Sequence, residues 1–367
     1  MADVLKSERG MILPAVLAAV MFFAEHSVLE TGRMASLIAA FVLIGGIVLA
    51  SIRIARHAEL LAHRVGDPYG TMILTLSAVL VEVIIIGILM LGEESPTLVR
   101  DTIYAAVMLD INGILGLAAL LGGLRYGEQP YNNDSGKTYV VMILTAMGIS
   151  MVVPEFIPRD RWYYYSAFNI FAMILLYGLF LRMQTGRHSY FFSYAYEDEV
   201  PEPPEPSGPA RKRLPSVPVG LSIAVIIFGV ALIGLLAEMM SALLTTGLEG
   251  SGAPPALMAV IVAAISAAPE ILTALRAALR NRMQAVVNIA LGASLSTVIL
   301  TVPVMEALAL VTGHPITMAM TPAQTVMVAL TLIVAAINLN DGETNAIEGM
   351  THFVLFGTFV MLTMLGL

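Results

Sequence analysis

The chain has 367 residues with a net charge of −8, and 58% of its residues are hydrophobic while only 13% are charged. An ordinary soluble domain carries about 25% charged residues, so this composition indicates a polytopic membrane protein. The acidic balance gives no basic footprint for nucleic acid, and the absence of cysteine excludes disulfides, thiolate metal sites and cysteine nucleophiles.

Apolar stretches long enough to cross a hydrocarbon core of roughly 30 Å as helices of about 20 residues recur along the whole chain. We predict an all-α membrane protein with eleven transmembrane helices. The first is expected to be retained, because residues 21–31, "MFFAEHSVLET", offer no small-residue cleavage site. The predicted spans are 11–27, 34–55, 70–92, 99–123, 138–156, 163–183, 216–246, 255–278, 284–312, 319–339 and 345–366.

The distribution of lysine and arginine predicts the orientation, because basic residues near helix ends are held on the cytoplasmic side. With the N-terminus in the cytoplasm and the C-terminus outside, only Arg33, Arg100, Arg159 and Arg161 fall in outer segments. The other fifteen of the 19 basic residues fall in inner segments. A single miscounted span early in the chain would reverse this split, so the alternation supports eleven spans.

One strongly polar interval, "YAYEDEVPEPPEPSGPARKR" at 194–213, is rich in proline and glutamate and is typical of a solvated linker. It divides the chain into an N-terminal segment with an extra helix (1–33), a first five-helix unit (34–183), a cytoplasmic linker (184–215) and a second five-helix unit (216–367). An odd number of spans per unit gives the two units opposite orientations. Inverted repeats of this kind are typical of transporters.

Each predicted unit contains one acid within a comparable apolar helix. Glu82 lies in "LSAVLVEVIIIGILML" and Glu270 in "ISAAPEILTALRAAL". A charged residue at the centre of a membrane helix costs roughly 2.5–3.5 kcal/mol on insertion scales, so two acids at matching positions need a reason. Three explanations stay open: protonated packing residues, an intramembrane catalytic pair, and a cation site whose carboxylate oxygens suit hard cations.

Neighbouring groups are candidate ligands for such a site. Pro269 has no N–H, so the Ile265 carbonyl loses its helical partner and becomes a further oxygen ligand. Ser77 and Ser266 lie about one turn before the two acids. Polar groups from two small-residue helices extend this set, and these are Asp110, Asn112, Asn288, Ser294 and Ser296.

Other polar residues point to no further chemistry. His57, Glu59 and His63 do not have the spacing of a helical H-E-x-x-H zinc site, and no G-x-S-x-G motif is present. A membrane hydrolase is therefore poorly supported. His352, within the last predicted helix, is expected to be a hydrogen-bonded core histidine.

The acid-bearing helices, the acidic linker, "RNRMQAVVNIALGASLSTVILTVPV" and "NDGETNAIEG" (340–349) resemble the Ca²⁺/H⁺ exchanger branch of the cation/Ca²⁺ exchanger superfamily, particularly its ChaA-like bacterial antiporters. The resemblance covers essentially the whole chain. It implies one extra helix followed by two inverted five-helix repeats, with Glu82 and Glu270 as the central cation- and proton-binding acids. It also implies that Glu59 and Glu238 are accessory acids on the preceding helices.

The sequence departs from this family at the two acids. The usual G-N-x-x-E reads "AVLVE" at 78–82 and "SAAPE" at 266–270, so both glycines and both asparagine ligands are missing. Calcium prefers about 6–8 oxygen ligands, and the loss of two amide carbonyls gives Na⁺ or K⁺ exchange more weight beside Ca²⁺.

The resulting hypothesis is a secondary antiporter of a bacterial inner membrane. It exchanges a cytosolic cation, Ca²⁺ or else Na⁺ or K⁺, for protons at a central glutamate pair. No cofactor is expected, and the partners are the lipid bilayer, inorganic cations and protons, with a homo-oligomer left open. A cation channel is the main alternative, since channels also use glutamate rings, and an intramembrane enzyme is the second alternative.

Overall fold

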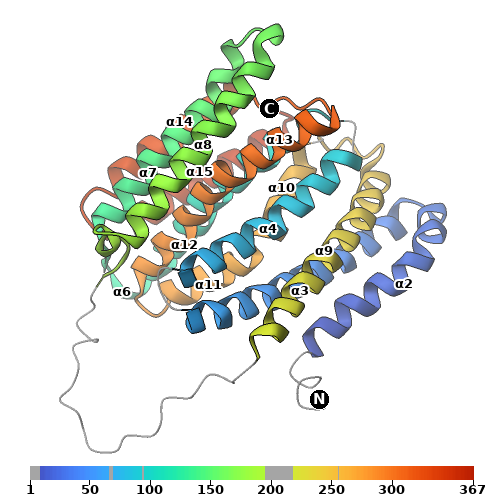
Figure 1. Cartoon of the computed structure of the whole chain (residues 1–367), viewed down its shortest axis with the longest axis horizontal. Helices are drawn as coiled ribbons and strands as arrows, with labels where there is room; N and C mark the ends of the chain where they lie inside the picture. Colours follow the sequence, from blue (N-terminus) through green and yellow to red (C-terminus); the bar gives the residue numbers. More distant parts are fainter. Residues whose placement is uncertain (1–8, 66–68, 93–94, 195–217, 255) are drawn as a thin grey trace, which may run out of the picture.

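The computed structural model describes residues 9–65, 69–92, 95–194, 218–254 and 256–367. Almost all of this chain is helical, as the composition predicts, and the helices run side by side as one elongated bundle (Figure 1). Most of the predicted acidic linker, residues 195–217, lies outside the described residues.

Up to the linker, the described residues form seven α-helices and several short π- and 3₁₀-helical turns. The elements used below are α2 (Arg9–Thr31), α3 (Arg33–Val65), α4 (Tyr69–Gly92), α5 (Leu98–Met108), η1 (Leu109–Leu115), α6 (Gly116–Tyr126), β1 (Gln129–Pro130), α7 (Asn133–Met147), η2 (Gly148–Val152), η3 (Val153–Phe156), η4 (Arg159–Arg161), α8 (Trp162–Thr185) and η5 (Ser189–Phe192).

The part after the linker is also helical. Its elements are α9 (Val219–Leu248), α10 (Ala256–Ser266), α11 (Ala268–Ala278), α12 (Met283–Ser296), η7 (Thr297–Thr301), α13 (Val302–Thr312), α14 (Pro322–Asn338), β2 (Glu343–Thr344) and α15 (Ala346–Met364). The two-residue strands β1 and β2 pair antiparallel and tie the α6–α7 connection to the α14–α15 connection.

Within the described ranges, nine helices are long and apolar enough to cross a membrane, and the bent pair α10–α11 makes ten if it forms one span. The predicted span at 319–339 corresponds to α14, which has 17 residues and is shorter than the others. The multi-pass architecture is therefore clear, while the predicted total of eleven spans is not confirmed. The inverted relation of the two halves also stays a prediction.

Proline residues lie close to three of the irregularities. The chain bends by 57° between α10 and α11, at Ala267, two residues before Pro269. In α12–η7–α13, the π-helical turn η7 ends two residues before Pro303, and η2 likewise ends two residues before Pro154. A proline cannot donate the helical hydrogen bond to the residue four positions earlier, so these segments change their winding or break. In contrast, α4 is continuous through Glu82.

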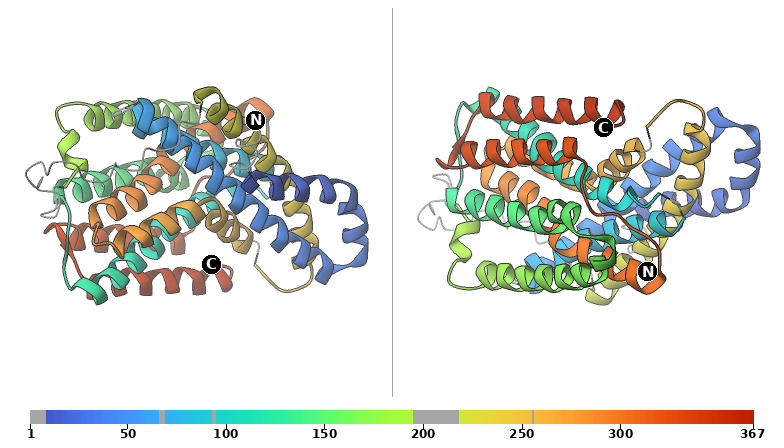
Figure 2. Two further views of the ribbon diagram at one scale, coloured as in Figure 1. Left: turned by 90° about the horizontal axis from the view of Figure 1, so that it is seen from below. Right: turned by 90° about the horizontal axis from the view of Figure 1, so that it is seen from above.

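Two clusters of buried apolar side chains fill the interior. One lies mainly among α5 to α8 and α12 to α15, and the other mainly among α2, α3 and α9. Both views of Figure 2 show α2, α3 and α9 together on one side of the molecule. The acid-bearing helices contribute to both clusters: Val81 and Ile85 of α4 belong to one, and Ile86 of the same helix to the other. These helices therefore lie at the boundary between the two clusters.

Helices α6 and α15 approach each other closely because glycine lies at their crossing. A Cβ atom on Gly349 would meet the backbone of Ala119 and Leu120, and one on Gly123 would meet the backbone of Ala346. Small residues permit such close contact between membrane helices. This crossing holds α15 against the segment that contains η1.

Candidate cation-binding site

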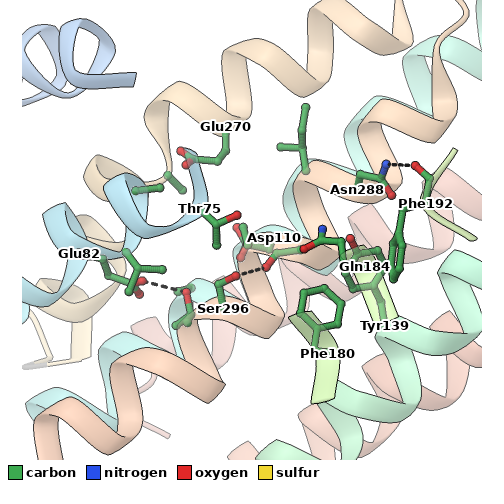
Figure 3. A pocket seen from close by; sticks show the side chains of 18 of the residues that line it. Thr75, Glu82, Asp110, Tyr139, Phe180, Gln184, Phe192, Glu270, Asn288 and Ser296 are labelled. Carbon is green, nitrogen blue, oxygen red and sulfur yellow. Dashed lines mark hydrogen bonds between the residues drawn. The ribbon is translucent and has the colours of Figure 1, made fainter. Parts of the chain in front are cut away.

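A cavity of about 570 Å³ lies between the two acid-bearing helices, the segments α5–η1 and α12–η7, and the ends of α7, α8 and η5. Three carboxylate side chains line it: Glu82 from α4, Asp110 from η1 and Glu270 from α11 (Figure 3). The fold thus brings the two predicted acids, which are 188 positions apart in the sequence, to one cavity, and adds Asp110 to them.

Glu82 is held by hydroxyl groups from the other half of the chain. Its Oε2 accepts hydrogen bonds from Thr297 Oγ1 at 3.0 Å and from Thr301 Oγ1 at 3.2 Å. Residues four positions apart lie on one face of a helix, and η7 directs both hydroxyls to this oxygen. The other oxygen, Oε1, is buried and has no hydrogen-bond partner among the described residues.

Glu270 lies in the first turn of α11, directly after the bend at Ala267. A helix N-terminus leaves backbone N–H groups without intrahelical partners, and its dipole favours negative charge there. The bend therefore provides a place where a carboxylate is tolerated inside the protein. Glu270 Oε2 is buried and, in the part of the chain that the structure describes, accepts no hydrogen bond.

Asp110 adds a third acid from the π-helical turn η1. It is fully buried, and its Oδ2 accepts a hydrogen bond from Ser294 Oγ at 3.2 Å. Its side chain lines the same cavity as those of Glu82 and Glu270. Three acids around one cavity repel one another when all are ionised, so binding a proton or a cation relieves this repulsion.

The acids are nevertheless separate enough to leave the cavity wide. Across residues 9–65, 69–92, 95–194, 218–254 and 256–367, no group of three or more acidic or histidine side chains converges at metal-ligating distance.

The cavity reaches the surface near the end of α8. The cavity lining includes the buried residues Glu82 and Asp110. It also includes Thr185, Ser189 and Ser193, which are exposed and mark the opening. The sequence did not predict these residues as part of a path, because nothing local marks them. Figure 3 shows Gln184 and Phe192 on the side of the cavity away from Glu82.

Three aromatic rings narrow the cavity between this opening and the acids. Tyr139 of α7, Phe180 of α8 and Phe192 of η5 contact one another, with ring centroids 5.4 to 5.9 Å apart. Asn288 Nδ2 donates to the Phe192 carbonyl at 2.8 Å and fixes η5 against α12. Asn288 thus lines the cavity beside the aromatic rings.

Of the other predicted polar residues near the acids, Ser266 and Ser296 line the cavity. Ser77 lines a smaller neighbouring chamber, which Ser266 and Glu270 also line. Ser294 contacts Asp110 without lining either space, and Ile265 lines neither space.

Asn112 is not brought to the cavity. Two residues along a helix turn the side chain by about 200°, so Asp110 and Asn112 face opposite sides. The Asn112 amide donates to Thr331 Oγ1 at 2.7 Å, and its Oδ1 lies 2.9 Å from His352 Nδ1. The expected core histidine is therefore hydrogen-bonded at Nδ1, while its buried Nε2 has no partner among the described residues.

The accessory acids Glu59 and Glu238 are exposed and line neither the cavity nor the smaller chamber. Thr297 and Thr301, in contrast, were not predicted, although both contact Glu82. Two threonines four positions apart in a segment that ends at Pro303 are the signal that could have indicated them.

Comparisons with known proteins identify the family of the chain. Residues 35–186 and 221–365 match the family model described as sodium/calcium exchanger protein. The chain is 34% identical over 359 residues to the sodium-potassium/proton antiporter ChaA of Escherichia coli. The aligned region covers 96% of this chain and 95% of that protein. It is also 34% identical over 327 residues to y4hA of Sinorhizobium fredii, an ionic transporter by name. That alignment covers 88% of this chain and 86% of y4hA.

A solved structure shows that the fold is shared. Native YfkE superposes with a TM-score of 0.76 at 19% sequence identity, covering 97% of this chain and 99% of that chain.

Proposed function

Because this chain belongs to the sodium/calcium exchanger protein family, we propose that it is a multi-pass membrane antiporter that exchanges a cation for protons at Glu82 and Glu270. The observation that carries this proposal is the meeting of both acids, with Asp110, at a single cavity that reaches the surface near α8. Cation and protons would then compete for the same carboxylate oxygens.

The mechanism follows from the energetics of charge in a membrane protein. The empty site with all carboxylates ionised is the least favourable state, because like charges repel at low dielectric. Protons or a cation neutralise it. If only the neutralised site crosses between the inward- and outward-open states, the protein couples the two fluxes and does not leak.

The packing supports a movement of this kind. Helices α3 and α9 pack mainly in one apolar cluster, and most helices around the cavity pack in the other. Sliding of one cluster against the other would change which side of Glu82 and Glu270 is open. Transporters with repeated units move in this way around a central site.

The two halves offer matching elements for an inverted repeat. Helix α4 with Glu82 would correspond to α10–α11 with Glu270, and the segment with η1 to the segment with η7. Each of the two segments contains a π-helical turn that contributes to the site. The turn in the first segment carries Asp110, and the turn in the second carries the two threonines that donate to Glu82. We infer a two-fold relation in the membrane plane.

Orientation follows from the basic residues. With the N-terminus in the cytoplasm of a bacterial cell, the end of α8 and the cavity opening face the cytoplasm. The state described above would then be open to the inside.

The transported ion is proposed as Ca²⁺, Na⁺ or K⁺. Carboxylate and hydroxyl oxygens suit all three. The relative in E. coli is named as a sodium-potassium/proton antiporter, and the two missing asparagine ligands also favour the monovalent ions. Glu59 and Glu238, both exposed, would gather cations at the two membrane surfaces.

One experiment tests the proposal. The protein is expressed in a strain without its own cation/proton antiporters, and a pH dye is followed in everted vesicles when Ca²⁺, Na⁺ or K⁺ is added in turn. An antiporter releases protons from the acidified lumen on addition of its ion. Cation uptake that persists without a proton gradient would favour a channel, and no response to any of the three ions would refute the proposal.

A further inference from the structure

Asp110 is flanked by two residues whose side chains point away from the cavity. Met108 and Asn112 lie two positions before and two positions after it, and Asn112 Nδ2 contacts Met108 Sδ at 3.7 Å. Residues four positions apart share one face of a helix, whereas the residue midway between them lies on the opposite face. The segment α5–η1 therefore presents Asp110 to the cavity and its two neighbours to α14 and α15.

A chain of hydrogen bonds holds this second face. An amide oxygen can only accept, so His352 Nδ1 of α15 donates to Asn112 Oδ1 at 2.9 Å. The Asn112 amide donates to Thr331 Oγ1 of α14 at 2.7 Å, and the Thr331 hydroxyl contacts Met108 Sδ at 3.6 Å. All four side chains are buried, with exposed fractions of 0% to 3%. The chain of bonds thus fastens the residues on both sides of Asp110 to two helices of the second half.

Two features of His352 show how the ring is used. It can approach η1 closely because residue 116 is glycine: a Cβ atom on Gly116 would lie 2.8 Å from His352 Cβ. Its other nitrogen, Nε2, is buried and has no hydrogen-bond partner among the described residues. Neither His352 nor Thr331 lines the cavity or the smaller chamber. An effect of these two side chains on a bound ion would therefore pass through the α5–η1 segment.

We propose that His352 and Thr331 are positioning residues, which hold η1 in the rotation that directs the Asp110 carboxylate into the cavity. A π-helical turn is a rare winding that occurs mostly as a single turn inside an α-helix, so it needs contacts that favour it over the α-helix. A buried amide without partners is destabilising. Loss of the His352 bond would therefore favour another rotation of η1, in which Asn112 finds other partners and Asp110 leaves the cavity.

The inference rests on the proposed function and deepens it, because it makes Asp110 a third acid of the cation site. Only the fraction of molecules with Asp110 in the cavity would bind the ion with full affinity. A change at His352 should thus alter the apparent affinity for the cation and leave the maximal rate at saturating cation unchanged.

The first test measures the orientation of residue 110 without transport. Because the chain contains no cysteine, Asp110→Cys gives a single thiol, and Ala293→Cys, which lines the cavity from α12, is the matched control. Each is combined with unchanged His352, with His352→Leu or with His352→Asn. Asparagine keeps a donor at the position of Nδ1 and lacks Nε2, so it serves as the rescue variant. The full-length proteins in detergent react with aminoethyl methanethiosulfonate, and mass spectrometry follows the labelling.

We expect His352→Leu to slow the labelling of Asp110→Cys by about tenfold, as the loss of one buried hydrogen bond predicts. The labelling of Ala293→Cys should not change. With His352→Asn, Asp110→Cys should be labelled nearly as fast as with unchanged His352.

The second test separates affinity from rate in everted vesicles, with Ca²⁺, Na⁺ and K⁺ each used as the probe ion. His352→Leu and Thr331→Val should raise the apparent KM of a transported ion by about tenfold at a nearly constant maximal rate. His352→Asn and Thr331→Ser should have a KM close to that of the wild type. Thr363→Val is the control, because this buried threonine of α15 donates to the Phe359 carbonyl of its own helix at 3.0 Å. It should change neither quantity.

Other results would overturn the inference in distinguishable ways. Equal labelling of Asp110→Cys in all three backgrounds, or no labelling in any of them, would contradict it. A lower maximal rate at unchanged KM in His352→Leu would mean that the histidine stabilises the fold without positioning Asp110. If no ion is transported while the labelling still depends on His352, the antiport proposal fails and the positioning of Asp110 stands.

Discussion

The hydroxyl of Thr297 lies 3.0 Å from Oε2 of Glu82, so a residue of the second half of the chain fixes the acid of the first half. This contact joins α4 to η7 at the boundary between the two apolar clusters. The carboxylate that is proposed to bind cation and proton therefore also forms a contact between the two halves of the chain. Movement of α4 relative to η7 would therefore change the ligands of Glu82 directly.

Replacing the central acids by amides tests their role. We expect Glu82→Gln and Glu270→Gln each to abolish exchange, because an amide has the same shape but cannot carry the titrating charge. The variants should remain inserted and monodisperse, as size-exclusion chromatography would check. Glu249→Gln, at an exposed glutamate after α9, is the matched control and should transport normally. Normal exchange in either acid variant would refute a shared site.

Removing the threonine hydroxyls should make the cation compete less well with protons for the Glu82 carboxylate. In Thr297→Val and Thr301→Val, the Glu82 carboxylate loses one hydrogen-bond donor while the side-chain shape is kept. The ionised form of Glu82 is then less stable, so the carboxyl group binds a proton more tightly. The apparent KM for the cation should therefore rise by about tenfold at constant pH. Thr312→Val, an exposed position on α13, is the control. A lower maximal rate at unchanged KM would point to a structural role instead.

Proton competition predicts the pH dependence. Lowering the pH on the side where the cation binds adds protons to the carboxylates, so the apparent KM should rise by up to about tenfold per pH unit for each proton displaced. The maximal rate should stay nearly constant once the cation is saturating. Initial rates over a cation series at several pH values would measure both quantities. A KM that does not depend on pH would leave Glu82 and Glu270 without the proposed role.

The opening of the cavity can be mapped with cysteine, since the chain contains none. Ala293→Cys lies in the cavity, and Thr312→Cys lies at the opposite end of the α12–α13 segment. We expect an impermeant maleimide to label Ala293→Cys from the cytoplasmic side, in everted vesicles, and Thr312→Cys only from the other side. The reverse pattern would show that the cavity opens outward. A saturating cation should slow the labelling of Ala293→Cys.

Glu306 is a buried acid whose contacts suggest stability and not transport. It lies outside the cavity, and Asn169 Nδ2 donates to its Oε2 at 2.9 Å. Asn169→Leu would leave a buried carboxylate without its main donor and should lower the free energy of unfolding by about 1–3 kcal/mol. Glu306→Gln, which can still accept this bond, should cost less. Thermal unfolding in detergent measures both, and a larger loss for Glu306→Gln would contradict this account.

Several features could be predicted from the sequence because they depend on local properties. Hydropathy over about 20 residues is enough to indicate a membrane helix. Two isolated acids in apolar helices are the basis for predicting Glu82 and Glu270, which the structure brings to one cavity. Pro269 was enough to place an irregularity next to Glu270, since a missing N–H acts within one turn. Whether the chain forms eleven spans in two inverted repeats remains a prediction.

The ligands around the acids were decided by the tertiary structure. Thr297 and Thr301 lie more than two hundred residues from Glu82 in the sequence, and Ser51 lines the smaller chamber beside Glu270 although it lies on another helix, α3. Each residue added to a helix rotates the following side chains by about 100°, so η1 and η7 determine which polar groups face the cavity. Asp110 faces it and Asn112 does not. Such rotations depend on the packing of all neighbouring helices at once, whereas the hydropathy of a segment depends on that segment alone.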